Sequence, residues 1–168
     1  PFSTGRPPLV FGEATKCSRF LSDSDKTYIA TLRLGATSST GDTEGVVSPG
    51  GPVPTSLSEI AAVSREMVGV SMQIPPMHSA VRVQGRRLYD LARQGVEVER
   101  EARAIRVDFF EIVEFSGEKL VISLKCSKGT YVRTLAESLG ERLGCGAYLT
   151  DRRRTETGGF RIEDAATP

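Results

Sequence analysis

The sequence contains no tryptophan and a single histidine, His78, among its 168 residues. One histidine gives no support to a metal site built on histidines, or to a catalytic triad that uses histidine as its base. The three cysteines, Cys17, Cys126 and Cys145, lie far apart, and none is in CxxC spacing. We therefore expect neither a metal site nor a disulfide framework, and the cysteine usage favours a reducing, cytoplasmic compartment.

Long apolar runs and several common motifs are also missing. No run approaches the roughly 18 residues of a membrane helix, so no membrane partner is expected. Gly-rich phosphate loops, HExxH and GxSxG are absent, which removes the support for the enzyme classes that they mark. Lys and Arg number 22 against 21 Asp and Glu, a net charge of +1. That balance neither requires nor excludes a nucleic-acid partner, because binding depends on how charges cluster.

Hydrophobic spacing predicts a single domain of mixed helices and strands. A half-buried strand is expected over 28–34, a short strand over 81–83, and a hairpin over 104–115 and 119–127. Helices are expected over 12–21, from 55 to 67, from 88 to a cap at Gly95, and over 130–143. Residues 35–54 are rich in Gly, Ser, Thr and Pro and are expected to form one long loop. Hairpins with interspersed helices favour an α+β fold over a doubly wound parallel sheet.

The polar stretch from Lys128 to Arg133 joins a strand to the start of a helix. The first N–H groups of a helix favour anions, so a phosphate or carboxylate could bind there. Arg133 lies beside the apolar stripe of Val132 and Leu135, so partial burial is expected, and a buried guanidinium needs an anionic partner. An internal salt bridge or a surface position is the ordinary alternative for Arg133. Taken alone, these residues predict only an α+β domain that could bind an anion.

Four stretches of the chain carry a more specific signal. They are Ser3–Gly5 with Gly12–Lys16; Asp23–Tyr28 running into Leu34-Gly35; Gln73–Ala80 through Gly85, Leu88-Tyr89 and Arg93–Gly95; and Lys128–Arg133 with Leu143–Ala147. In this order and spacing, over nearly the whole chain, they resemble the TruB family, the B-type tRNA pseudouridine synthases that isomerise the T-loop uridine of tRNA. The resemblance implies a pseudouridine-synthase fold: a mixed, largely antiparallel sheet with flanking helices and an RNA-binding cleft. It also implies tRNA as the partner, bound through its T-arm, and chemistry without a cofactor or metal.

The start of the chain matches part of the family's catalytic motif, which resembles Asp-Pro-Leu-Ala-Thr-Gly. Pro1 to Gly5 match the residues after the aspartate, so the nucleophilic aspartate is expected directly before Pro1. By the resemblance, residues 1–168 form one catalytic domain, truncated at its N-terminus and without the family's small C-terminal RNA-binding domain. The chain by itself is expected to be inactive, and its parent protein is expected to be an isomerase.

Three residues acquire roles through the resemblance. Arg133 matches the arginine that orients the aspartate and keeps it ionised, as an adjacent guanidinium does for a carboxylate. Tyr28 matches the tyrosine that stacks on the flipped base and takes part in proton transfer at the sugar. Core packing is the alternative for a strand tyrosine. Tyr131 matches a second substrate-contacting tyrosine, and packing at a helix start is the alternative for it.

Basic residues are candidates for binding the RNA backbone. Lys16, Lys128 and Arg152 are expected to bind substrate, with ordinary surface positions as the alternative for the two lysines. Further candidate phosphate contacts are Arg82, Arg86 and Arg87, and the run Arg152–Arg154. A solvated charged face is the alternative for the first of these groups.

Two positions depart from the family pattern. Arg6-Pro7 stands where the family usually has two apolar residues, so the loop after the active site is expected to differ. Asp151-Arg152 stands where the family more often has an apolar pair that shapes the base pocket. His78 lies beside the Pro75-Pro76 turn, where the family lines its cleft, and a structural role is favoured for it.

Two other functions fit parts of the sequence. A non-catalytic module that grips the T-arm of tRNA is the main alternative, and the residue encoded directly before Pro1 separates it from an enzyme. A protein-interaction domain without an RNA role is the third reading. It predicts no salt-dependent binding to a T-arm hairpin.

Overall fold

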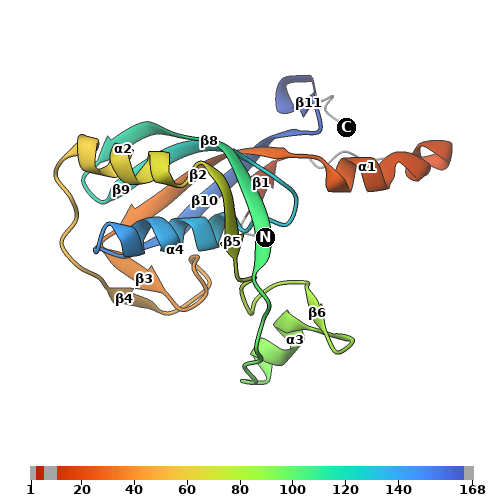
Figure 1. The fold of residues 1–168 in the computed structure, drawn as a ribbon, viewed down its shortest axis with the longest axis horizontal. Helices are drawn as coiled ribbons and strands as arrows, with labels where there is room; N and C mark the ends of the chain where they lie inside the picture. The colour runs from red at the N-terminus through yellow and green to blue at the C-terminus, as the bar shows by residue number, and fades with distance from the viewer. Residues whose placement is uncertain (1–2, 6–10, 165–168) are drawn as a thin grey trace.

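The computed structural model describes residues 3–5 and 11–164, and one twisted sheet dominates it (Figure 1). Its strands lie in the order β1 (Ser3–Gly5), β10 (Ala147–Thr157), β2 (Lys26–Leu34), β9 (Lys119–Cys126), β8 (Arg103–Ser116) and β5 (Gly69–Gln73), with β11 (Phe160–Arg161) also paired to β10. Only the β1–β10 pairing within this described sheet is parallel. The α+β fold with a mixed, largely antiparallel sheet is therefore confirmed.

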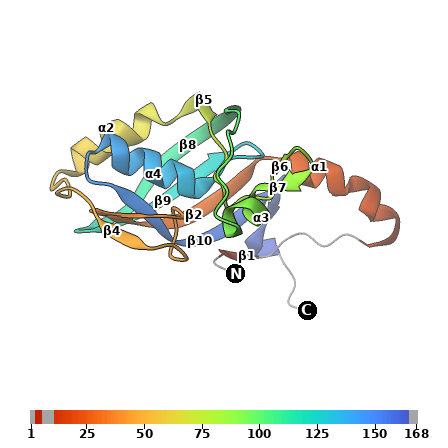
Figure 2. The same ribbon diagram turned by 90° about the horizontal axis from the view of Figure 1, so that it is seen from below.

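Two helices, α2 (Leu57–Glu66) and α4 (Val132–Arg142), lie along the same face of this sheet (Figures 1 and 2). The segment η1 (Gly12–Cys17) with α1 (Ser18–Asp23) extends away from the sheet and contains no buried residue. A small unit projects separately from the sheet, at the bottom of the view in Figure 1. It contains β6 (Arg82–Val83), β7 (Arg86–Arg87) and α3 (Leu88–Arg93). The short helix η2 (Ile162–Asp164) is a separate element that follows β11. Within the described ranges, no helix has the length and apolar character needed to cross a membrane.

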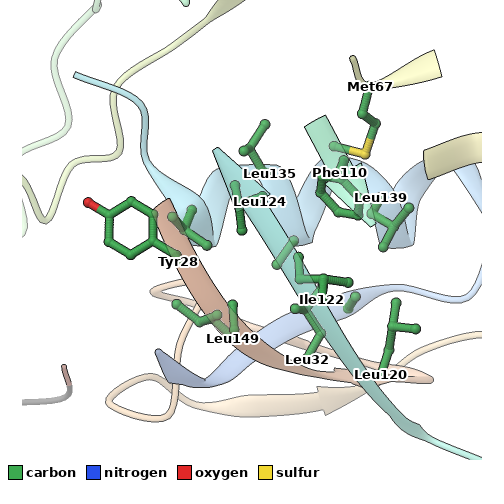
Figure 3. Close-up of a cluster of buried hydrophobic side chains, with 14 of the residues drawn as sticks. Tyr28, Leu32, Met67, Phe110, Leu120, Ile122, Leu124, Leu135, Leu139 and Leu149 are labelled. Carbon is green, nitrogen blue, oxygen red and sulfur yellow. The ribbon is translucent and has the colours of Figure 1, made fainter. Parts of the chain in front are cut away.

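The core lies between the sheet and the two helices (Figure 3). Tyr28, Leu32 and Leu34 share one face of β2, because successive strand residues point to opposite faces, and none is more than 6% exposed. The fully buried Leu139 of α4 packs into the same cluster, and burial of such a side chain contributes about 2 kcal/mol. Gly140 lets α4 approach β10 closely, since a Cβ there would lie 2.1 Å from the Ala147 nitrogen.

Most predicted elements are confirmed. The helical segment from Gly12, the strand ending at Leu34, the long hairpin β8–β9 and helix α4 lie within one to three residues of their expected bounds. Gly95 follows Gln94, the C-cap of α3, with a φ of +71°, as expected for a helix-capping glycine.

The expectation of one long loop over 35–54 is wrong. That segment contains a hairpin, β3 (Ala36–Ser38) and β4 (Val47–Pro49), which packs its first strand against β10. Three-residue strands rich in Ser, Thr and Pro carry too little alternation to be recognised from sequence. Strands β5 and β10 were also not predicted, and β10 contains the whole Arg152–Arg154 run.

Candidate active site

The start of α4 is clamped to the edge strand β5. The backbone N–H of Tyr131 donates to Oε1 of Gln73 at 2.8 Å, and Nε2 of Gln73 donates to the Tyr131 carbonyl at 3.2 Å. Gln73 is 7% exposed, so these two hydrogen bonds are largely shielded from water. The clamp holds the first turn of α4 and thereby positions Arg133, the second residue of the helix.

Asp42 is the second anchor of the site and lies in the turn between β3 and β4. Its Oδ1 accepts hydrogen bonds from the Thr40 hydroxyl at 2.6 Å and from the Glu44 backbone N–H at 3.1 Å. The Ser38 hydroxyl donates to the Asp42 carbonyl at 2.5 Å. Asp42 also forms an isolated parallel bridge with Leu149 of β10. These bonds hold the carboxylate inward, with its side chain only 6% exposed.

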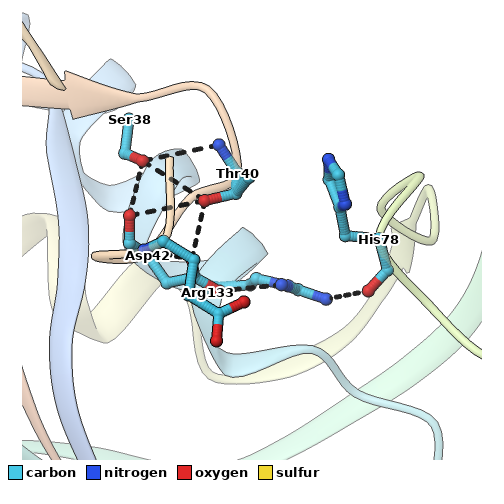
Figure 4. A network of polar contacts seen from close by, with 6 residues as sticks. Ser38, Thr40, Asp42, His78 and Arg133 are labelled. Carbon is cyan, nitrogen blue, oxygen red and sulfur yellow. Dashed lines mark hydrogen bonds and ion pairs between the residues drawn. The ribbon is translucent and has the colours of Figure 1, made fainter. Parts of the chain in front are cut away.

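Arg133 and Asp42 form a buried ion pair (Figure 4). Nη1 of Arg133 donates to Oδ2 of Asp42 at 2.8 Å, and the two side chains are 16% and 6% exposed. Nη2 of Arg133 donates to the backbone carbonyl of His78. One planar fork therefore connects the β3–β4 turn, α4 and the segment after Pro76. A buried pair of this kind is costly to break, because the remaining charge loses its partner.

Glu137 lies one turn after Arg133 on α4, beside the Asp42 turn. A Cβ on Gly41 would lie 2.8 Å from Oε1 of Glu137, and the φ of Gly41 is +73°, which favours glycine. Burial raises the pKa of Glu137, with the charge of Arg133 opposing this shift and that of Asp42 adding to it. The site thus places a second carboxyl group, that of Glu137, near the guanidinium that pairs with Asp42.

Tyr28 lies at the edge of the core, with its hydroxyl pointing away from the other labelled side chains (Figure 3). It is 6% exposed and belongs to the hydrophobic cluster, and its role toward a substrate stays a prediction. The guanidinium carbons of Arg152 and Arg154 each lie 5.7 Å from the ring centroid. Burial raises the pKa of the Tyr28 phenol, and the charges of Arg154 and Arg152 oppose that shift.

Arg152 connects Tyr28 electrostatically with the Arg133–Asp42 pair. Burial lowers the pKa of Arg152, the nearby Tyr28 and Asp42 oppose the shift, and the charges of Arg133 and Arg154 add to it. Tyr28, Arg133, Arg152 and Asp42 therefore form one cluster. Three of these four were predicted as site residues from the sequence.

The elements joined by Arg133 also line a cleft of about 580 Å³. The lining includes Ser39, Thr40, Met77, His78, Thr134 and Glu137. The hydroxyl of Thr134 is buried there without a hydrogen-bond partner in the described structure. Within those same described ranges, no group of three or more His, Cys, Asp and Glu side chains has metal-binding geometry. The available chemistry is that of guanidinium, carboxylate, hydroxyl and phenol groups.

The other predicted substrate contacts lie outside this cluster. Lys16 pairs with Glu13 at 2.5 Å on η1, and Lys128 pairs with Asp23 at 2.9 Å at the end of α1. Both lysines are more than half exposed. The side chain of Tyr131 is partly exposed at the start of α4. Their roles in substrate binding stay predictions.

The remaining basic candidates, the Arg6-Pro7 position and His78 lie in different parts of the chain. Arg82, Arg86 and Arg87 are exposed on the β6–β7 hairpin of the projecting unit. The Arg6-Pro7 position lies outside the described residues. His78 is exposed, and its contact with Arg133 is made by its backbone carbonyl, which fits the structural role expected for it.

Asp42 was missed by sequence reasoning. It lies in Gly41-Asp42-Thr43-Glu44-Gly45, inside the segment that was expected to be a loop. An acidic residue between glycines is a common turn signal and says nothing about burial. Its pairing with Arg133 spans 91 positions of sequence, so only the fold brings the two together.

The sequence model of the "TruB family pseudouridylate synthase (N terminal domain)" matches residues 1–132. The chain belongs to the TruB family. It is 48% identical to tRNA pseudouridine synthase B of Dechloromonas aromatica (strain RCB), over 99% of this chain and 56% of that protein. It is 47% identical to tRNA pseudouridine synthase B of Neisseria meningitidis serogroup B, over 99% of this chain and 54% of that protein. The chain thus spans about half the length of these curated TruB relatives.

Solved structures share the fold. A Cbf5–Nop10–Gar1 complex contains a chain that matches with a TM-score of 0.69 and 27% identity, over 94% of this chain and 37% of that one. An H/ACA ribonucleoprotein bound to a substrate RNA containing 2′-deoxyuridine matches with a TM-score of 0.63 and 24% identity, over 94% and 36%. The pseudouridine-synthase fold expected from the sequence is thereby confirmed.

Proposed function

We propose that the protein containing this chain isomerises the T-loop uridine of tRNA to pseudouridine without a cofactor. The observation that carries the proposal is the buried Arg133–Asp42 pair, which joins three separate segments of the chain. Structural ion pairs also occur in cores, but this one borders a cleft and uses only part of its donor capacity. Membership of the TruB family and similarity to tRNA pseudouridine synthases B support the same activity.

The reacting carboxylate in this proposal is an aspartate encoded directly before Pro1. Strand β1 runs parallel to β10 with Ser3 level with Arg152. Asp42 bridges Leu149, three residues before Arg152 on the same strand β10. A guanidinium has five N–H donors, and those of Arg133 that serve Asp42 and His78 leave others for a second carboxylate. Such a contact would keep the aspartate ionised and fix its direction.

The reaction exchanges one glycosidic bond for another. The bond from ribose C1′ to N1 of uracil breaks, the base turns, and C1′ bonds to C5. The proton on C5 leaves to solvent and N1 acquires a proton, so the product is an isomer of the substrate. The uridine must leave its base stack to react. In this proposal the ring of Tyr28 stacks on the flipped base, and its hydroxyl transfers a proton at the sugar.

The proposal includes binding of the tRNA through its T-arm and activity in the cytoplasm. The exposed arginines of the β6–β7 hairpin and the lysines at positions 16 and 128 could bind RNA phosphates. Cys17, Cys126 and Cys145 are free thiols, which supports a reducing compartment such as the cytoplasm.

Release of tritium from C5 of uridine in a T-arm stem–loop RNA tests the activity. The full-length protein with aspartate directly before Pro1 should release tritium in proportion to the pseudouridine formed. The matched variant with asparagine at that position should bind the RNA and release none above background. Tritium release by the asparagine variant would refute the assigned nucleophile. Salt-dependent RNA binding with no release by either protein would instead support a non-catalytic RNA-binding module.

A further inference from the structure

We propose that Arg152 and Arg154 form an anion site beside Tyr28 that binds a phosphodiester group of the RNA, next to the uridine that enters the site. The inference rests on the proposed function, because it names an additional substrate contact of the same site. It concerns how the nucleotide is held and leaves the chemistry at C1′ unchanged.

The register of β10 places the two arginines on the same face. Arg154 is opposite Tyr28 and Arg152 is opposite Ala30 in the antiparallel β2–β10 pair. Tyr28 and Ala30 face the core side of the sheet, which also carries α4. Arg152 and Arg154 are both partly buried, whereas Arg153 between them is exposed. The strand therefore directs two of its three consecutive arginines toward the site.

Both guanidinium groups lack a full set of partners. Within the part of the chain that the structure describes, the Nε atoms of Arg152 and Arg154 are buried without a hydrogen-bond partner. Neither arginine forms an ion pair with any acidic side chain among residues 3–5 and 11–164. Buried charged donors without partners are costly. The contact of both groups with the Tyr28 ring compensates part of this cost. It satisfies neither Nε donor.

The nearby acidic group is already engaged. Asp42 is the acid whose charge acts on Arg152, and its Oδ2 is bonded to Arg133 while its Oδ1 accepts from Thr40 and Glu44. The cluster therefore has an excess of positive charge at Arg152 and Arg154. An anion supplied by the substrate would complete it.

A phosphodiester has the geometry that this pair of arginines requires. Its two unbridged oxygens accept the parallel N–H groups of a guanidinium fork, which makes arginine well suited to phosphate recognition. A phosphodiester adjacent to the uridine would also come within reach of Arg152 and Arg154 when the base stacks on Tyr28. The two arginines would then fix the position of the flipped nucleotide.

Arg152→Leu in the full-length protein is the main test variant. Leucine keeps an apolar side chain beside Tyr28 and removes the orphaned donor, so the melting temperature should stay equal or rise. Affinity for a T-arm stem–loop RNA should fall about tenfold, as expected for a lost charge-assisted hydrogen bond. The slope of log affinity against log salt should become shallower by about 0.7 to 0.9, the value for one phosphate contact.

Arg33→Gln is the matched control. Arg33 lies on β2 with its side chain on the opposite face from Tyr28, is half exposed, and pairs with Glu118 at 2.9 Å. This variant should keep the salt slope of the wild-type protein. A second control, Arg152→Lys, keeps the charge and should retain most of the salt slope while losing part of the affinity, because lysine lacks the fork.

A thermodynamic cycle that combines the protein variants with modified RNA linkages identifies which phosphate is bound. The linkages on either side of the target uridine are replaced, one at a time, by an uncharged methylphosphonate. One replacement should weaken binding of the wild-type protein about tenfold and binding of Arg152→Leu less than about twofold, since the partners of a contact are not additive. Arg33→Gln should respond as the wild-type protein does.

Three outcomes would overturn the inference. The first is an unchanged salt slope in Arg152→Leu, and the second is additive losses in the methylphosphonate cycle. The third is a lowered melting temperature with unchanged RNA affinity, which would assign Arg152 to an internal carboxylate instead. If the wild-type protein releases tritium and any of these three results is found, the phosphate site is refuted and the proposed activity stands. Absence of that release refutes the proposed activity and leaves the binding measurements to decide the anion site.

Discussion

Asp42→Asn is the substitution whose effect can be worked out most fully from the structure. Asparagine keeps the shape of the side chain and can still accept from the Thr40 hydroxyl and the Glu44 N–H through Oδ1. The NH₂ group of asparagine then replaces Oδ2 and faces Nη1 of Arg133. In the wild-type structure this nitrogen lies 2.8 Å from Oδ2 of Asp42. Two hydrogen-bond donors then face each other, and an arginine whose side chain is only 16% exposed loses its counter-charge.

The expected loss is large because the pair is buried. Removing one partner of a buried ion pair costs about 3–5 kcal/mol of the free energy of unfolding. For a domain of this size that corresponds to a fall in melting temperature of roughly 10 °C. Glu66→Gln is the matched control, since Glu66 and Arg142 form an ion pair at 3.3 Å with side chains 67% and 49% exposed. An exposed pair contributes less than about 1 kcal/mol.

Urea unfolding of the full-length protein, followed by circular dichroism and fluorescence, measures both variants. Asp42→Asn should lower the unfolding midpoint clearly, and Glu66→Gln should leave it almost unchanged. Combining Asp42→Asn with Arg133→Met should cost less than the sum of the single changes, because the unpaired charge is removed. Equal midpoints for Asp42→Asn and Glu66→Gln would refute the claim that the Arg133–Asp42 pair is a buried structural element.

Three further predictions concern Tyr28, Glu137 and the cysteines. Tyr28→Phe should preserve RNA affinity but slow turnover, whereas Tyr28→Ala should also weaken binding by about 1–3 kcal/mol of stacking energy; full turnover by the Phe variant would leave only the stacking role. Because burial raises the pKa of Glu137 above 4.5, the folded state retains its proton to higher pH than the unfolded state. Its contribution to stability is therefore present below the unfolded pKa and lost as the pH rises through the raised folded pKa; Glu137→Gln should flatten this decline in pH-dependent urea unfolding, and an identical pH profile would contradict it. Alkylation of the native protein, mapped by mass spectrometry, should modify the exposed Cys17 and spare the buried Cys126 and Cys145, since burial raises the pKa of the Cys126 thiol to about 11; modification of all three at equal rates would be inconsistent with this burial.

The local sequence pattern was sufficient to predict the helices and strands whose hydrophobic periodicity is strong. Helix α4 has apolar residues at helical spacing, and β2 and β9 alternate over eight or nine residues, so one face of each is identifiable without the fold. Strand β10 was missed because its middle reads Asp151-Arg152-Arg153-Arg154, which has no apolar alternation. It is a strand because it is paired on both edges, by β1 and β2, and such tertiary pairing overrides local preference.

Individual site residues could be predicted from the sequence only where they belong to a recognisable motif. Arg133 was expected to be partly buried and to need an anion, and both expectations agree with its pairing to Asp42. The identity of that anion depended on the β3–β4 turn, which sequence reasoning had treated as an unstructured loop. The different environments of Arg152 and Arg153 follow from strand register, so they could not be assigned before β10 was recognised.

The most direct test of the central claim, that Arg133 serves a reacting carboxylate, is the single-turnover rate of Arg133→Lys at saturating enzyme. Lysine keeps the charge but has no planar fork, so it cannot hold Asp42, the His78 carbonyl and a second carboxylate together. In the full-length protein with aspartate directly before Pro1, the rate of tritium release should fall at least about a hundredfold, or roughly 2.7 kcal/mol. RNA affinity at two salt concentrations should change much less. An unchanged rate with weakened, less salt-dependent binding would show instead that Arg133 contacts RNA phosphate and has no catalytic role.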